Sequence, residues 1–369
     1  MEVMKLSAAP QHALLLRTSK LFYQLGRTAL YRSIWITSSS SIIKLHQTFL
    51  ATIGGGSLAA AVRRFELIHI DRDSPSLSVP LSIFLDSLFQ ILVCIRNVDH
   101  LQLYLEEENA IGAPLHRPLF LTAPFRKLSS FSTTLCSKHD HQCILHFLGN
   151  HPWIQHLSLT VLDRKFHRSV HLTDPTQNIE LPELQSYSGP IEILKLIVPS
   201  TKNLSSIVIH SGERNEADIA NFERDLKALE PLEKLETNSI HKALAIEVVV
   251  SPDNTAANVA LKWLPKNLTS LSFQYNMSTA MSLGLQPSLV ALYPFDPQQM
   301  KRFQRLTSFS MNCVASRKID QAFGAVFPEI AKVVEVCPSL ESIQIRGKVC
   351  NGHDLEKMHS KYVHTPAVS

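Results

Sequence analysis

Residues 320–345 read DQAFGAVFPEIAKVVEVCPSLESIQI, and this stretch decides how the chain is interpreted. From Asp320 to Val336, apolar side chains recur at helical spacing, which predicts an amphipathic helix. Cys337-Pro338 ends that helix, because proline has no backbone N–H to donate. The following residues alternate between apolar and polar side chains, which suits a short strand with one buried face. The stretch therefore predicts a unit of helix, proline turn and strand, with apolar residues at Leu340, Ile343 and Ile345.

The strand end of this unit recurs along the chain as a triplet: apolar, two residues, apolar, one residue, apolar. A proline often precedes it, as at Pro152 and Pro265, and helical periodicity often precedes the proline, as in Asp140 to Asn150. The other full copies are Val62-Phe65-Leu67, Val98-Leu101-Leu103, Ile154-Leu157-Leu159, Ile191-Leu194-Leu196, Leu204-Ile207-Ile209, Leu268-Leu271-Phe273 and Leu306-Phe309-Met311, with looser copies at Leu128-Phe131 and Leu184-Tyr187.

The spacing of the triplets predicts a repeat protein. Matched middle positions lie 36 residues apart from Phe65 to Leu101 and 34 apart from Phe309 to Ile343. The longer gap between Ile207 and Leu271 leaves room for a hidden unit, which we place at Leu232-Leu235. Together with 51 leucines in 369 residues, this predicts an α/β fold: an irregular leucine-rich-repeat-like solenoid of about nine or ten helix–turn–strand units.

Composition narrows the classes of function. The chain is 45% hydrophobic with a formal net charge of +4, which excludes wholesale disorder. Lys and Arg are scattered, so we expect no nucleic-acid partner. The most apolar window, Val79 to Ile95, is interrupted by Asp86 and Gln90, so we interpret it as a buried helix and expect no membrane span. The six cysteines form no CxxC pair and the N-terminal residues lack a secretory pattern, which predicts a cytoplasmic or nuclear protein, or one found in both.

The motifs that could carry chemistry are weak. On a helix, His139, Cys143 and His146 would share one face and could bind a metal, but with 17 histidines in the chain we favour coincidence. The run Gly54 to Ser57 lacks the Lys-Ser/Thr ending of a phosphate loop, so we interpret it as a flexible connector. We therefore expect no enzyme activity, no catalytic residues, no cofactor and no metal.

The segment from Leu14 to Ile36 reads LLLRTSKLFYQLGRTALYRSIWI and resembles the second half of an F-box. The leucine-rich helix of that motif matches Leu15 and Leu16, its middle matches Ser19 and Phe22, and its end matches Leu25, Leu30 and Tyr31. An F-box-like segment followed by irregular leucine-rich repeats is similar to the large group of fungal F-box proteins. The resemblance divides the chain into an F-box-like remnant or cap (1–37), a solenoid (38–359) and a flexible tail (360–369).

The resemblance implies a non-enzymatic substrate receptor of an SCF-type (cullin-RING) ubiquitin ligase, which would hold an unknown substrate protein. The contacts to the Skp-type adaptor and its cullin complex would come from the matched apolar residues. The usual first F-box helix, which begins with a Leu-Pro pair, is missing here. Two alternatives stay open: the remnant is only a cap on the solenoid, or the chain is a leucine-rich-repeat scaffold or interaction protein unrelated to ubiquitin. The adaptor contacts implied are Leu15, Leu16, Phe22, Leu25, Leu30 and Tyr31.

Overall fold

The computed structural model describes thirteen stretches of the chain, and the statements below concern these alone. They are residues 26, 29–51, 55–68, 80–104, 125–135, 138–161, 179–210, 216–236, 243–250, 255–275, 297–313, 327–345 and 348–351. The chain forms two compact units. The first unit contains Met1–Phe166 and Ile179–Leu184, and the second contains His167–Asn178 and Gln185–Ser369.

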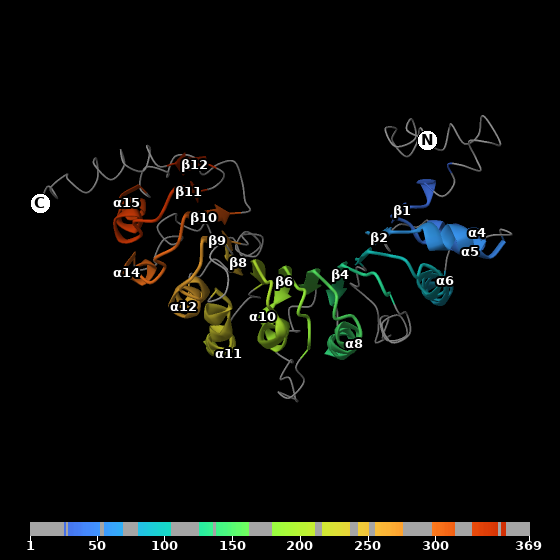
Figure 1. Cartoon of the computed structure of the whole chain (residues 1–369), viewed down its shortest axis with the longest axis horizontal. Helices are drawn as coiled ribbons and strands as arrows, with labels where there is room; N and C mark the ends of the chain where they lie inside the picture. Colours follow the sequence, from blue (N-terminus) through green and yellow to red (C-terminus); the bar gives the residue numbers. More distant parts are fainter. Residues whose placement is uncertain are drawn as a thin grey trace, which may run out of the picture. The chain divides into compact units, whose positions relative to one another are not determined.

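The first unit is a parallel sheet with helices between its strands. Neighbouring strands pair in chain order from β1 to β5, and every pair is parallel. Helices α6 and α8 lie on one side of these strands in Figure 1. The elements are β1 (Ser33–Ile36), α4 (Ser39–Ala51), α5 (Gly55–Ala61), β2 (Arg64–Leu67), α6 (Leu81–Cys94), β3 (His100–Leu103), β4 (Ser130–Leu135), α8 (Lys138–Gly149) and β5 (His156–Val161).

The second unit repeats this arrangement. Strands β6 to β11 pair in parallel and in chain order, and β12 closes the row by pairing antiparallel with β11. Figure 1 shows α10, α11, α12, α14 and α15 along one side of these strands. The elements are β6 (Ser186–Pro190), α10 (Ile191–Ile197), η1 (Val198–Ser200), β7 (Ser206–His210), α11 (Glu216–Lys227), η2 (Glu230–Glu236), β8 (Ala245–Val250), α12 (Thr255–Trp263), β9 (Ser270–Tyr275), α14 (Pro297–Met300), β10 (Ser308–Cys313), α15 (Phe327–Val336), β11 (Ser342–Ile345) and β12 (Lys348–Asn351).

The core of each unit lies between the strands and the helices. Side chains alternate along a strand, so one set faces the helices and the other set faces away. The helix-facing set is apolar and in register from strand to strand: Phe65 lies beside Leu101 in the first unit, and Leu271 lies beside Phe309 in the second. All four side chains are at most 2% exposed. This burial of apolar surface is the main force that holds helix and strand together.

The turns that lead into the strands also repeat. In the first unit, Leu128 N–H donates to Phe125 O at 3.3 Å, and in the second, Leu340 N–H donates to Cys337 O at 3.1 Å. The first and last residues of each turn are buried, while the residues between them are less buried or exposed. The first apolar residue of each triplet thus serves to anchor the turn, and the next two serve the strand.

A second recurring feature joins consecutive helix–strand repeats within each unit, at the strand entrances. In the first unit, Asp99 O accepts the backbone N–H groups of Ser129 and Ser130, both at 2.9 Å. In the second unit, Thr269 O accepts the backbone N–H of Thr307 at 2.9 Å and its Oγ1 hydroxyl at 3.1 Å. The carbonyl groups at the strand entrances therefore accept hydrogen bonds from the following repeat. These bonds fix the register between neighbouring strands.

In the first unit, His151 ties two successive turns together. Its Nε2 accepts the backbone N–H of Phe125 at 3.2 Å, so its Nδ1 carries the proton and donates to Phe147 O at 2.7 Å. The buried ring stacks on Phe147 with 4.0 Å between centroids. Trp153 Nε1 donates to the carbonyl of the same Phe125 at 3.2 Å. The backbone of Phe125 is thus bonded on both sides by the next turn.

The structure confirms most of the predicted strands and corrects three assignments. In seven full triplets the last two residues lie in strands β2, β3, β5, β7, β9, β10 and β11, and the last residue of each looser copy lies in β4 or β6. The triplet Ile191-Leu194-Leu196 is wrong, because these residues form helix α10. The hidden unit exists, but its strand is β8, and Leu232-Leu235 lies in η2. The predicted connector at Gly54 to Ser57 is also wrong from Gly55 onward, where α5 begins.

Among the described residues, no helix combines the length and the apolar character needed to cross a membrane.

Candidate binding surface on the polar face of the strands

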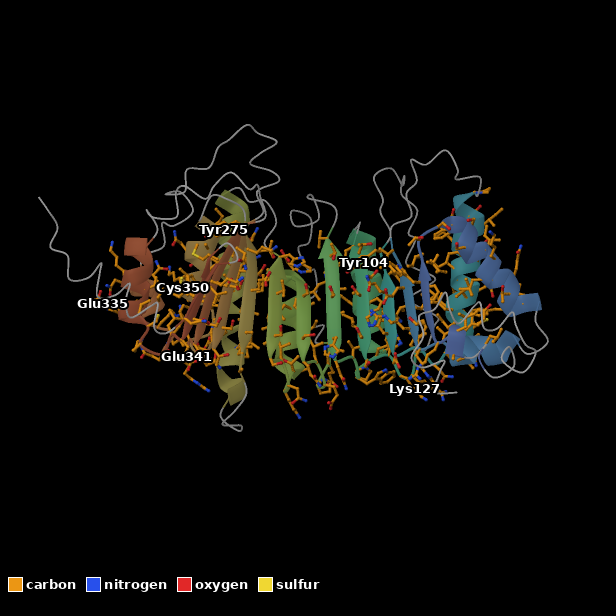
Figure 2. The ribbon with its side chains drawn as sticks, turned by 90° about the horizontal axis from the view of Figure 1, so that it is seen from above. Tyr104, Lys127, Tyr275, Glu335, Glu341 and Cys350 are labelled. Carbon is orange, nitrogen blue, oxygen red and sulfur yellow. The ribbon has the colours of Figure 1, made fainter. Side chains whose placement is uncertain are left out.

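The strand side chains that point away from the helices form a surface that we call the polar face. It consists of the residues between the apolar positions of each strand. Figure 2 shows the strands side by side in each unit, with their carboxyl ends at one edge and the entrance turns at the other. In the first unit Tyr104 lies at the carboxyl edge and Lys127 at the turn edge, and in the second unit Tyr275 and Glu341 lie in the same way.

The polar face of the first unit is charged and aromatic. Trp35 on β1 is 70% exposed, and the register places it beside Glu66 on β2. Glu66 Oε1 pairs with Arg64 Nε on the same strand and lies 3.6 Å from His100 Nε2 on β3. Burial lowers the pKa of His100, and the positive charge of Arg64 adds to this effect. His100 is therefore neutral near pH 7, and Arg64 is the cation that compensates Glu66.

Further along, this face turns to neutral hydrogen-bonding groups. The hydroxyls of Tyr104, just after β3, and Ser132 on β4 share a hydrogen bond of 3.0 Å. Gln102 lies beside Ser132 in the strand register, and His156 on β5 lies beside Ser130. An exposed indole next to a compensated ion pair and several amide and hydroxyl groups is typical of the centre and rim of a protein interface.

The polar face of the second unit has a different chemistry. Most of its side chains are serine, glutamine or asparagine, and the charged residue among those described is Glu247 on β8. His210 on β7 contributes a second titratable group, whose Nε2 lies 3.3 Å from Ser188 Oγ. Serine occupies the polar-face positions of several neighbouring strands, namely Ser186 and Ser188 on β6, Ser206 on β7, Ser270 and Ser272 on β9, Ser308 and Ser310 on β10, and Ser342 on β11.

The charged residues on the helix side of the second unit have a structural role. Lys195 Nζ on α10 bonds Asp225 Oδ1 on α11 at 2.8 Å, and Asp225 is 4% exposed. Trp263 Nε1 on α12 donates to Glu223 Oε1 at 2.9 Å, and Lys227 lies 4.3 Å from the centroid of the Trp263 ring. These contacts join successive helices, so they hold neighbouring repeats in place.

The predicted adaptor-binding residues fall mostly beyond what the structure describes. Leu15, Leu16, Phe22 and Leu25 lie outside the described residues, as does the predicted tail at 360–369. Leu30 and Tyr31 are described and partly buried, and the Tyr31 ring lies 6.2 Å from Phe49 on α4. The end of the predicted cap segment (1–37) forms β1, which pairs with β2.

The histidine and cysteine cluster lies on α8, as its helical spacing predicts. His141 is buried, Cys143 is partly buried and His146 is exposed, so these three side chains have different surroundings. Within the described part of the chain, no group of three or more potential metal ligands comes together. The side chain of His139 lies outside what the structure describes.

Sequence reasoning missed the residues that characterise the polar face. Trp35 lies in the segment that resembles an F-box, so no strand is predicted there from the sequence. Glu247 lies after Leu232-Leu235, the position at which the strand of the hidden unit is predicted. The available signal is the same in both cases: the residue between two apolar positions of a strand, as in Ile34-Trp35-Ile36 and Ile246-Glu247-Val248. Had both strands been found, alternation would have placed these two side chains on the polar face.

Comparison with protein-family models and with curated proteins gives no match. The fold and the polar face are therefore the basis for the function proposed below.

Proposed function

We propose that this chain is a non-enzymatic protein-binding subunit built as a leucine-rich-repeat-like solenoid. The repeated strand entrances and turns support the solenoid. Each helix–strand repeat forms backbone hydrogen bonds with the next repeat along the chain rather than with a distant element. Stacked repeats present a row of strands whose side chains can cover the area that a standard protein interface requires.

The observation that carries the proposal is the exposed Trp35 beside the ion pair of Arg64 and Glu66. Burying an indole that is 70% exposed would contribute strongly to binding, since tryptophan and arginine are the residues most enriched among binding hot spots. A compensated carboxylate next to it gives specificity at low desolvation cost. This combination favours a protein partner at the first unit.

A direct test compares two exposed apolar residues of the first unit. Trp35 on β1 is 70% exposed on the polar face, and Leu50 on α4 is 69% exposed. We expect Trp35→Ala to deplete specific partners from the full chain purified from cells, as measured by quantitative mass spectrometry, while Leu50→Ala leaves them in place. Equal recovery with both variants would contradict binding at this face.

The more specific version of the proposal is a substrate receptor of an SCF-type ubiquitin ligase. Its support is the resemblance of residues 14–36 to the second half of an F-box. In this version the Skp-type adaptor would contact the N-terminal segment, including Leu30 and Tyr31, and a substrate would contact the polar face. Catalysis would belong to other subunits, and the chain would contribute by holding the substrate close to them.

Binding of the Skp-type adaptor tests the ligase version. If that version holds, the full chain co-purifies with the adaptor, and a Leu30→Asp variant loses the complex while remaining folded by circular dichroism. A chain that never binds the adaptor discards the ligase version.

The alternative is a leucine-rich-repeat scaffold unrelated to ubiquitin. It is favoured by β1, because Ser33–Ile36 continue the strand row in register with β2 instead of forming a separate element. In this version the N-terminal segment caps the first repeat, whose apolar interior would otherwise be exposed.

A further inference from the structure

Glu247 is placed where a partner could reach it. It lies in the middle of β8, and the strand register puts Val208 of β7 on one side and Ser272 of β9 on the other. Along its own strand, Ala245 and Val249 share its face. Two of these neighbours are aliphatic, one is an alanine and one is a serine, so none of them carries charge.

The wider surroundings of Glu247 are also neutral. The diagonal neighbours on β7 and β9 are Ser206, His210, Ser270 and Gln274. His210 is the one titratable group among them. Within the described part of the second unit, no Lys or Arg lies on the polar face of strands β6 to β11.

The first unit has a carboxylate at the equivalent strand position, and there a cation of the same strand compensates its charge. Glu66 occupies the same polar-face position within β2 that Glu247 occupies within β8, one residue after the first apolar strand position. Arg64 pairs with Glu66 from two residues earlier on the strand. The residue two positions before Glu247 is Ala245, which offers no charge. Among the described residues, the first unit thus supplies a cation at this strand position, whereas the second unit does not.

Burial has a measurable consequence at this position. It raises the pKa of Glu247 above the ordinary value of 4.5. Burial thus disfavours the charged form of this carboxylate, and a hydrogen-bonding cation would offset that free-energy cost.

We infer that the polar face of the second unit binds an extended segment of a partner protein, and that a Lys or Arg side chain of that segment pairs with Glu247. The inference rests on the proposed binding function and specifies its partner. The four side chains directly beside Glu247 are short, so an extended backbone can approach the strands closely there. Serine hydroxyls both donate and accept, so they can bond the backbone of that segment. A partly buried carboxylate selects a cation among the side chains the segment carries.

The test selects linear peptides from a random library displayed on phage, using the full chain as bait. We expect the selected peptides to share a Lys or Arg. A synthetic peptide from this set should bind Glu247→Gln about tenfold more weakly than the natural chain, as measured by isothermal titration calorimetry. Glu341→Gln is the matched control, because Glu341 is an exposed carboxylate of the same unit at the turn edge (Figure 2), and it should bind normally.

A second substitution separates the ion pair from general loss of binding. Replacing the shared cation of the peptide with norleucine should weaken binding to the natural chain but add nothing in Glu247→Gln. Peptides that bind Glu247→Gln as tightly as the natural chain would refute the inference while leaving the proposed function intact. If no peptide is selected, the inference also falls, and the proposed function falls with it only if the Trp35-dependent partners are absent too.

Discussion

Replacing His151 tests whether the bonds between successive turns stabilise the first unit. In His151→Leu an apolar side chain fills most of the space, but the backbone N–H of Phe125 loses its acceptor, which now lies at 3.2 Å. Phe147 O loses the Nδ1 donor yet keeps the backbone N–H of Asn150 at 3.1 Å, so it stays satisfied. The perturbation therefore removes one hydrogen bond from a buried donor and one stacked ring contact.

The magnitude follows from these two losses. A buried donor left without a partner costs about 1–3 kcal/mol, and an aromatic pair contributes about 0.5–1.5 kcal/mol beyond its buried area. We expect His151→Leu to lower the free energy of unfolding of the first unit by about 2–4 kcal/mol. His151→Ala should cost about 1–2 kcal/mol more, because it also leaves a cavity.

Hydrogen exchange is the appropriate assay, since it reports the protection of individual segments, whereas a single melting curve would average over both units. Peptides that cover residues 125–161 should lose protection in His151→Leu, with the amide of Phe125 affected most. His146→Leu is the control, because His146 is an exposed histidine on α8, five residues before His151. The reasoning is refuted if His151→Leu costs less than about 0.5 kcal/mol, or if His146→Leu costs as much.

Three further predictions concern charged and ionisable groups. Lys195→Met should destabilise the second unit by about 2 kcal/mol in urea unfolding, because it leaves the buried Asp225 without its 2.8 Å partner. Adding Asp225→Leu to Lys195→Met should recover part of this loss. A double variant whose loss of stability equals the sum of the two single losses would contradict the prediction. Burial raises the pKa of Glu247, so folding favours the protonated form of its carboxyl group. The stability of the fold therefore declines as the pH rises from the pKa of the unfolded chain, about 4.5, through the higher pKa of the folded chain. Glu247→Gln should therefore raise the melting temperature at pH 7 and have no effect near pH ~3.5, and a constant difference across this range would count against the assignment. Burial raises the pKa of the Cys337 thiol to about 11, so iodoacetamide at pH ~8 should alkylate the exposed Cys94 but leave Cys337 unmodified until denaturant is added, as peptide mass spectrometry can check.

The sequence predicted the strands well because the triplet combines two independent requirements. In Leu268-Leu271-Phe273 the first residue anchors the turn and the other two face the helices, and all three are fully buried. A pattern that must satisfy both a turn and a strand is seldom produced by a helix or a loop. The same reasoning predicted α6 and α8 to within two residues at each end.

The errors arose where that double requirement was relaxed. Helix α10 is almost wholly buried, so Ile191, Leu194 and Leu196 are apolar without marking a strand, and apolar spacing alone cannot distinguish a buried helix from a strand. In β8 the anchor and strand positions, Leu244, Ile246 and Val248, simply alternate, so the three-residue step of the triplet is missing. The polar face was not predictable in the same way, because strand register decides which polar residues become neighbours.

The position of β1 leads to a test that separates the two versions of the proposed function. Tyr31 lies four residues before Trp35, so an adaptor on Leu30 and Tyr31 and a partner on Trp35 would approach the same edge of the first unit. A ligase receptor must hold both at once, whereas a capped scaffold has no need to do so. We therefore expect, in the ligase version, that saturating the chain with the Skp-type adaptor leaves the recovery of Trp35-dependent partners unchanged. If the adaptor displaces those partners from the natural chain, and Leu30→Asp restores them in its presence, the two sites overlap and the chain cannot deliver a substrate bound at Trp35.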